Sequence, residues 1–188
     1  MKELLKNIEY KIKSATKGIT TENRGELTFL KTIIDEYNIK KVLFLRQDRI
    51  GDLLISSPLF RILKEKYPDI EFDILLSNYN TSAYELVKNY FSNAYLYHKK
   101  FVKDLNLVKN LRAKKYDLII DLMDKPSSTS ALLIKIIKPK YAAGLEKSNS
   151  DIYNFIVKRK DESKFHIIER TAEFLTLFGL SRAIMIYR

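Results

Sequence analysis

The stretch that decides the fold is Lys41-Val-Leu-Phe-Leu-Arg46, followed at once by Gln47-Asp-Arg-Ile-Gly-Asp52. Its first half is a short apolar run, typical of a strand buried on both faces. From Leu53 to Lys66 the apolar residues then recur at helical spacing. A buried strand followed directly by a helix indicates the first unit of a parallel sheet.

The same alternation continues along the chain. We expect further strands at 71–76, 94–97, 117–122 and 141–144. Helices are expected at 82–90, 102–114, 128–137 and 166–178, the last of them ended by Gly179. Strands that alternate with helices of this length predict an α/β fold, a Rossmann-like open parallel sheet with helices on both faces.

The beginning of the chain has a different pattern. Residues 2–14 and 26–37 have apolar residues at helical spacing, separated by a break at 18–25. We therefore expect a helical N-terminal extension over residues 1–39 and the Rossmann-like domain over residues 40–188. The lysine-rich amphipathic segment 1–20 fits two roles, lying on anionic lipid or docking on the domain, and docking is the commoner use of such helices.

Composition narrows the function classes. The 188 residues suit one domain with a short extension, and 46% hydrophobic with 30% charged residues is a normal globular balance. The chain has no cysteine and only two histidines, which argues against disulfides, thiolate metal sites and a zinc site. Charges interrupt the apolar residues near Met1, so no signal peptide is expected and a cytoplasmic location is predicted.

The net charge of +11 suggests an anionic partner of some kind. Nucleic acid, an anionic membrane surface and phosphorylated small molecules all fit, as does an inert basic surface. The basic stretch 99–115 favours a nucleic-acid-binding module as the competing reading. However, no nucleic-acid motif is recognisable and the 12 tyrosines are scattered, so no specific nucleic acid is expected.

Ligands of open parallel sheets bind at the carboxyl ends of the strands. That rule selects the segments 46–52, 77–80, 98–100 and 121–130. None of them carries a glycine-rich dinucleotide or phosphate-binding loop, and the chain has only five glycines. A dehydrogenase or phosphate-loop ATPase is therefore disfavoured, and no cofactor is expected.

Gly51 and Asp52 follow the first strand. Gly51 would allow a tight turn, and Asp52 is expected as the first residue of the next helix. An aspartate there fits two roles, capping the helix or acting in catalysis, and from spacing alone capping is the commoner one.

The motif Arg46-x-Asp-Arg-Ile-Gly-Asp52 resembles the opening motif of glycosyltransferase family 9, which contains the ADP-heptose:lipopolysaccharide heptosyltransferases. Further parts of the resemblance are Pro58, Leu63-Lys64, Tyr67-Pro68, the stretch Lys115–Leu122, Ser130–Leu133, Lys140–Gly144, Glu169-Arg170, Phe174-Leu175 and Phe178–Leu180. The resemblance implies the first of two Rossmann-like lobes, the GT-B arrangement, in which this lobe receives an anionic glycolipid acceptor and the other binds the nucleotide-sugar.

The resemblance also implies roles for individual residues. Asp52 matches the presumed general base of an inverting sugar transfer, in which a carboxylate takes the proton of the attacking hydroxyl. Arg46, Arg49, Gly51 and Lys125 are the expected substrate-binding residues. Arg46 has the alternative of pairing with a carboxylate such as Asp48, and Arg49 that of a solvated surface charge.

The sequence departs from the family in two respects. Met123 and Asp124 replace the family's usual residues after Asp121-Leu122, a departure that bears on the identity of the substrate. Lys125 would preserve a basic contact there. Ser127–Ser130 fit two roles, capping the next helix or binding an anion, and capping is the commoner one. The donor-binding lobe is also absent from these residues, so we expect no transfer by this chain alone. A lobe that binds a partner without catalysing a reaction is a further alternative for the function. We also expect peripheral contact of the protein with the inner face of the cytoplasmic membrane.

Overall fold

The computed structural model describes residues 32–99, 101–181 and 183–186. The helix expected at 2–14 therefore lies outside the described residues, as does the first half of the one expected at 26–37. The described end of the latter is a short helix, α2 (Ile33–Glu36), which Thr32 caps by accepting a hydrogen bond from the Asp35 N–H.

Six parallel strands form one sheet in the order β3-β2-β1-β4-β5-β6. Their bounds are β1 (Lys41–Leu45), β2 (Glu71–Ser77), β3 (Asn93–Tyr97), β4 (Leu118–Asp121), β5 (Tyr141–Leu145) and β6 (Phe155–Val157). The chain builds outward from β1 in one direction through β3, then returns to add β4 on the other side of β1. This is the predicted Rossmann-like open sheet, and its topological switch point lies between β1 and β4.

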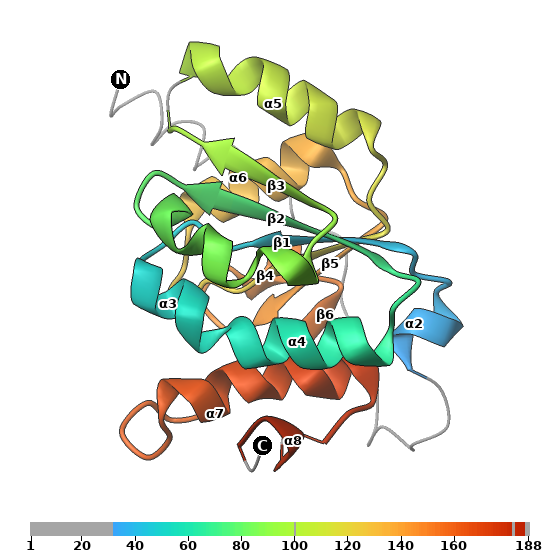
Figure 1. Cartoon of the computed structure of the whole chain (residues 1–188), viewed down its shortest axis with the longest axis vertical. Helices are drawn as coiled ribbons and strands as arrows, with labels where there is room; N and C mark the ends of the chain where they lie inside the picture. The colour runs from blue at the N-terminus through green and yellow to red at the C-terminus, as the bar shows by residue number, and fades with distance from the viewer. Residues whose placement is uncertain (1–31, 100, 182, 187–188) are drawn as a thin grey trace.

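Helices cover both faces of the sheet (Figure 1). On one face lie α3 (Ile50–Ile55), α4 (Ser57–Lys66) and α7 (Ile167–Ala172), and on the other α5 (Phe101–Ala113) and α6 (Ser128–Ile137). The remaining elements are η1 (Thr81–Leu86), η2 (Lys88–Tyr90), η3 (Ser150–Ile152), η4 (Glu173–Phe178) and α8 (Ala183–Ile186).

The two cores follow from the alternation of side chains along β1. Val42 and Phe44 pack into the core on the α4 side, whereas Leu43 and Leu45 pack into the core on the α5 and α6 side. Phe44 also stacks against Phe72 and meets Phe60 edge-on, with ring centroids 5.8 and 5.2 Å apart. β1 is thus buried on both faces, as its apolar run predicts, and it holds the loop that follows it in a fixed place.

Several features differ from the sequence prediction, among them the helix expected at 166–178, which is α-helical only to Ala172 and 3₁₀ over Glu173–Phe178. The helix expected at 53–66 begins at Ile50 and breaks at Ser56 into α3 and α4. Pro58 explains the break, since proline lacks the N–H that a continuous helix needs and its ring clashes with the preceding turn. The helix expected at 82–90 is two 3₁₀ turns, and the three-residue strand β6 was not expected.

Candidate active site

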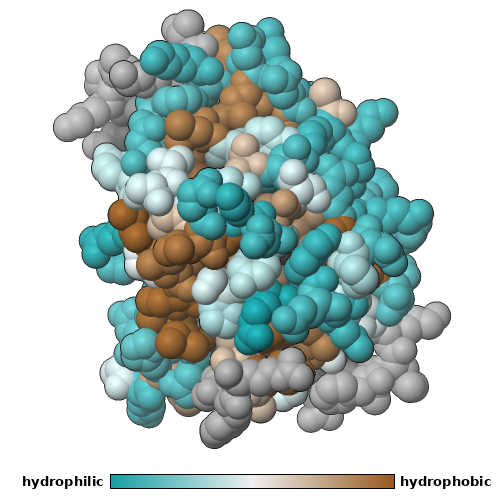
Figure 2. All heavy atoms as spheres, in the orientation of Figure 1, coloured by the Kyte–Doolittle hydropathy of each residue, from teal (hydrophilic) through white to brown (hydrophobic). Residues whose placement is uncertain are grey.

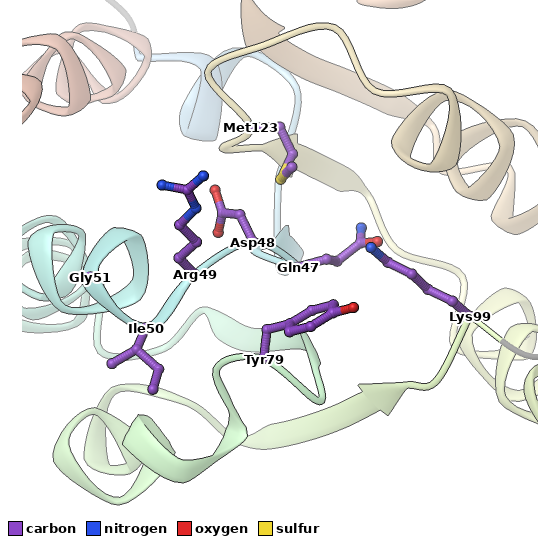
Figure 3. Close-up of a pocket in the computed structure, with 8 residues that line it drawn as sticks. All are labelled: Gln47, Asp48, Arg49, Ile50, Gly51, Tyr79, Lys99 and Met123. Atoms are coloured by element: carbon purple, nitrogen blue, oxygen red, sulfur yellow. The ribbon is translucent and has the colours of Figure 1, made fainter.

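A pocket opens at the carboxyl ends of the strands, beside the switch point between β1 and β4 (Figure 3). Its volume is about 660 Å³. The lining residues are Gln47, Asp48, Arg49, Ile50, Gly51, Tyr79, Lys99 and Met123. Each of the four segments expected at this edge contributes at least one of them, so the sheet brings together residues far apart in the sequence.

Asp52 lies next to this pocket, in the first turn of α3. It is the third residue of that helix rather than the first, because the helix begins at Ile50. Its Oδ2 accepts a long hydrogen bond of 3.4 Å from the Arg49 N–H, and the side chain is partly exposed. Asp52 therefore makes a capping contact and keeps access to solvent, although it is not among the residues that line the pocket.

Arg46 is a buried anchor beneath the pocket, with only 2% of its surface exposed. It donates to the backbone carbonyl of Asp52 through Nε and Nη2, at 3.0 and 2.7 Å, and through Nη1 to the carbonyl of Leu122. Its Nη1 also pairs with Asp48 Oδ2 at 3.1 Å. The structure thus favours the alternative considered for Arg46, that of a structural partner of Asp48.

Asp48 is the carboxylate whose electrostatics are most perturbed at this edge. Burial raises its pKa to about 6, and the attraction of Arg46 opposes that rise only in part. Asp52 and Asp121 add to the rise through like-charge repulsion. Oδ1 of Asp48 is buried and has no hydrogen-bond partner among the described residues.

Gly51 does not form the expected tight turn. It lies inside α3, and among the described glycines only Gly179 has a positive φ. A Cβ built on Gly51 would meet nothing within 4 Å, so the missing side chain leaves open space in the pocket wall. What the absent side chain of Gly51 provides here is open space beside the backbone, not a positive φ.

The remaining expected basic residues have different positions. Arg49 is exposed and lines the pocket, and Figure 3 shows its side chain beside that of Asp48. Lys125 is exposed as well, two residues beyond Met123, but it does not line the pocket. Of the two exposed cations, Arg49 thus lies in the pocket wall and Lys125 lies outside it.

Four lining residues had no role assigned from the sequence, although they fall within the segments expected at this edge: Gln47, Ile50, Tyr79 and Lys99. Tyr79 is 68% exposed, and the Lys99 ammonium lies 5.3 Å from the centre of its ring. Figure 3 shows the Gln47 side chain extending toward Lys99, and its Nε2 has no partner among the described residues. Nothing in their own segments singles these side chains out, because only the meeting of β1, β2 and β3 brings the segments together.

The two aspartates at and after the end of β4 are both engaged by other side chains of the scaffold. Asp121 is fully buried and accepts hydrogen bonds from Lys147 Nζ at 3.0 Å and Tyr153 Oη at 2.6 Å. Asp124 receives two hydrogen bonds from Arg170 Nη1, at 3.0 and 2.9 Å, which tie the end of β4 to α7. Asp124 is thus engaged in the scaffold, and of the two divergent residues only Met123 faces the pocket.

The segment after β4 caps the next helix as expected. Ser127 Oγ accepts a hydrogen bond from the Ser130 N–H at 3.2 Å, at the N-terminus of α6. In the described part of the chain, no group of three or more metal-binding side chains gathers into a metal site. Within the same residues, no helix has the length and apolar character needed to cross a membrane.

Comparison with known proteins supports the resemblance. Residues 105–181 match the model of glycosyltransferase family 9 (heptosyltransferase). Lipopolysaccharide heptosyltransferase 3 of Escherichia coli is 32% identical over 99 residues, which are 48% of this chain and 28% of that protein. The protein of that name in strain K12 is 38% identical over 84 residues, 40% of this chain and 24% of that protein. The putative lipopolysaccharide heptosyltransferase 4 of strain K12 is 25% identical over 145 residues, 76% of this chain and 40% of that protein.

Solved structures show the same fold. The E. coli heptosyltransferase WaaC with ADP matches with a TM-score of 0.61 at 20% identity, over 76% of this chain and 48% of that one. The glycosyl transferase family 9 protein from Veillonella parvula matches with a TM-score of 0.58 at 17% identity, over 76% of this chain and 42% of that one. The chain thus spans less than half of the length of each of these three relatives and two solved structures.

Proposed function

Because this chain is a glycosyltransferase family 9, heptosyltransferase-like protein, we propose that it forms the acceptor-binding lobe of an inverting sugar transferase. The donor is a nucleotide-linked heptose-like sugar, and the acceptor is an anionic, lipopolysaccharide-core-type glycolipid. The protein acts in the cytoplasm, at the inner face of the membrane that carries this lipid.

The observation that carries the proposal is the pocket beside the switch point of the sheet. Rossmann-like sheets bind their ligands there, and the pocket combines the cations Arg49 and Lys99 with the exposed ring of Tyr79. A guanidinium and an ammonium suit phosphates or carboxylates, whereas an aromatic face suits the C–H face of a sugar. This mixture fits a charged sugar better than a flat nucleic-acid surface.

Asp52 is the proposed general base. It is partly exposed in the turn of α3 that borders the pocket, so an acceptor hydroxyl can approach it. As the hydroxyl oxygen bonds to the anomeric carbon, its proton passes to the Asp52 carboxylate and the bond from that carbon to the nucleotide's phosphate oxygen breaks. The N–H of Arg49 and the anchor of Arg46 on the Asp52 carbonyl support the orientation of this residue.

The donor site is proposed to lie on a second lobe outside residues 1–188. The pocket lacks a glycine-rich loop or another recognisable nucleotide cradle, and the solved relatives are about twice as long as the part that matches this chain. Without that lobe the sugar donor is not held in line with the acceptor hydroxyl, so transfer loses the advantage of positioning.

A transfer assay with ADP-heptose and deacylated inner-core oligosaccharide tests the proposal. The 188-residue chain alone should give no product, whereas the same chain joined to a donor-binding lobe should give it. In the joined protein Asp52→Asn should lower the rate by about 10²–10⁴-fold, as expected for a lost general base. Asp69→Asn, at an exposed carboxylate elsewhere, is the matched control, and an equally active Asp52→Asn protein would refute the catalytic role.

A further inference from the structure

Asp48 presents an unused hydrogen-bond acceptor at the pocket. Its Oδ2 pairs with Arg46 Nη1 at 3.1 Å, whereas its Oδ1 is buried without a partner among the described residues. A buried polar atom in that state has lost its hydrogen bonds to water without replacing them, which carries a free-energy cost. A ligand that brings a donor to Oδ1 recovers this cost, so the atom is a source of binding free energy.

The surroundings of Asp48 suit a hydroxyl-rich ligand. Figure 3 shows its side chain between Arg49 and Met123, with the Tyr79 ring on the other side of the loop. The neighbouring Gln47 offers an unpaired buried donor, Nε2, from the same pocket wall. One wall therefore offers both an acceptor and a donor, as the recognition of sugar hydroxyls requires.

From this geometry we propose that ionised Asp48 is an acceptor-positioning residue, whose Oδ1 accepts a hydrogen bond from a hydroxyl of the acceptor sugar. The inference rests on the proposed function and adds a second carboxylate to it. Asp52 removes the proton of the reacting hydroxyl, while Asp48 holds another hydroxyl so that the reacting one faces Asp52. Arg46 links the two, because it contacts the Asp48 carboxylate and the Asp52 carbonyl.

The proposal predicts a dependence of binding on pH. Burial raises the pKa of Asp48 to about 6, so the carboxylate takes up a proton on mild acidification. The protonated group donates instead of only accepting, and its attraction to Arg46 is lost. The charged or titratable groups that face Asp48 are Arg46, Asp52 and Asp121, together with Arg49, Tyr79 and Lys99 around the pocket. None of these groups has an ordinary pKa near 6, whereas a phosphate of the oligosaccharide and the nearby His98 do. A loss of binding around pH 6 therefore reports Asp48 when it is present in the wild type and absent in Asp48→Asn.

The test uses the 188-residue chain and deacylated inner-core oligosaccharide, with affinity measured by calorimetry from pH 5 to pH 8. Wild-type protein should bind more weakly below pH 6. At pH 7.5 Asp48→Asn should bind about tenfold more weakly, the equivalent of about 1.4 kcal/mol, and its affinity should be nearly constant over the pH range. Asp69→Asn should match the wild type, and Asp48→Glu should keep a pH-dependent affinity.

The outcomes of this test distinguish failure of the Asp48 inference from failure of the proposed acceptor site. Binding by the wild type that Asp48→Asn leaves unchanged overturns the Asp48 inference and leaves the acceptor site standing. Absence of binding by the wild type at every pH overturns both. Carbon-13 NMR of the carboxyl groups gives a readout that does not need the ligand, since one carboxyl should titrate near pH 6 in the wild type and be missing in Asp48→Asn. If no carboxyl of the wild type titrates near pH 6, a loss of binding on acidification cannot be assigned to Asp48, and the pH-dependent part of the inference fails.

Discussion

Arg46 donates through both Nε and Nη2 to the backbone carbonyl oxygen of Asp52, at 3.0 and 2.7 Å. One buried side chain at the end of β1 thus fixes the first turn of the helix that carries the proposed base. The position is held further by Asn80, whose Nδ2 donates to the Arg46 carbonyl at 2.8 Å. The candidate site is therefore rigid at the level of the backbone, even where its rim is exposed.

Replacing Arg46 by methionine should strongly destabilise the protein. The substitution leaves the carboxylate of Asp48 mostly buried without its cation, and the carbonyls of Asp52 and Leu122 lose donors. We expect a loss of about 3–5 kcal/mol in the free energy of unfolding, measured by urea denaturation at pH 7. Arg49→Met, at an exposed arginine of the same loop, should change it by less than about 0.5 kcal/mol. Similar losses in the two variants would contradict the anchor role.

Replacing Gly51 by alanine should raise the stability of the protein but weaken its binding of the acceptor. Gly51 lies in a helix and has open space where a Cβ would be, so alanine should raise stability by about 0.5–1 kcal/mol. The added methyl group enters the pocket, and we expect weaker binding of the inner-core oligosaccharide in calorimetry. A more stable protein with unchanged affinity would show that the ligand does not approach this part of the wall.

The raised pKa of Asp48 should be visible in stability as well. Its pKa moves from 3.8 to about 6 on folding, so between these values the folded state binds more protons than the unfolded state. The contribution of Asp48 to the free energy of unfolding therefore falls as pH rises from about 4 to 6. Between pH 4 and pH 7, the free energy of unfolding of Asp48→Asn should therefore rise by about 2–3 kcal/mol relative to that of the wild type. If the free energies of unfolding of the two proteins change with pH in the same way over this range, the raised pKa of Asp48 is contradicted.

Tyr153 should contribute to stability through the buried carboxylate of Asp121. Tyr153→Phe removes a hydrogen bond of 2.6 Å and leaves Lys147 to neutralise that carboxylate. We expect a loss of about 1–3 kcal/mol, seen as a lower urea midpoint. Tyr79→Phe removes the same hydroxyl from a ring that is 68% exposed, and its midpoint should stay at the wild-type value.

The fold was predictable because its signals are local. The run Val42–Leu45 indicates a strand buried on both faces, and it is one. The α5 and α6 segments were likewise predicted within one residue at each end. By contrast, β6 has only three residues, too few for a periodic signal, and the break at Ser56 depends on the effect of Pro58.

The location of the candidate site could be predicted from the sequence, but most of the side chains that form it could not. The pocket lies at the carboxyl ends of the strands, where ligands of open parallel sheets bind. This location could be predicted because it depends on the topology of the sheet alone. The buried state of Arg46 and the use of Asp124 by Arg170 were not visible, because the partners lie up to 76 and 46 positions away. Tyr79 and Lys99 meet at the pocket only through the packing of β2 and β3 beside β1.

The apolar surface beside the pocket also arises from the tertiary arrangement. Ile50 and Leu54 of α3 and Leu86 of η1 are large apolar side chains that remain exposed. Figure 2 shows hydrophobic residues gathered over α3 on this face of the molecule. In the sequence, Ile50 and Leu54 follow the helical pattern of core residues, and nothing local distinguishes them from Leu53, which is fully buried.

The most direct test of the acceptor site is chemical-shift mapping of the nitrogen-15-labelled chain with deacylated inner-core oligosaccharide. Acceptor binding at the pocket predicts that the shifts concentrate on the amides of residues 47–51, Tyr79, Lys99 and Met123, which line it. The amides of Lys40 and Lys41, which donate to Asp117 at the opposite edge of the sheet, should stay unchanged. Shifts concentrated at that opposite edge, or none at saturating oligosaccharide, would contradict it.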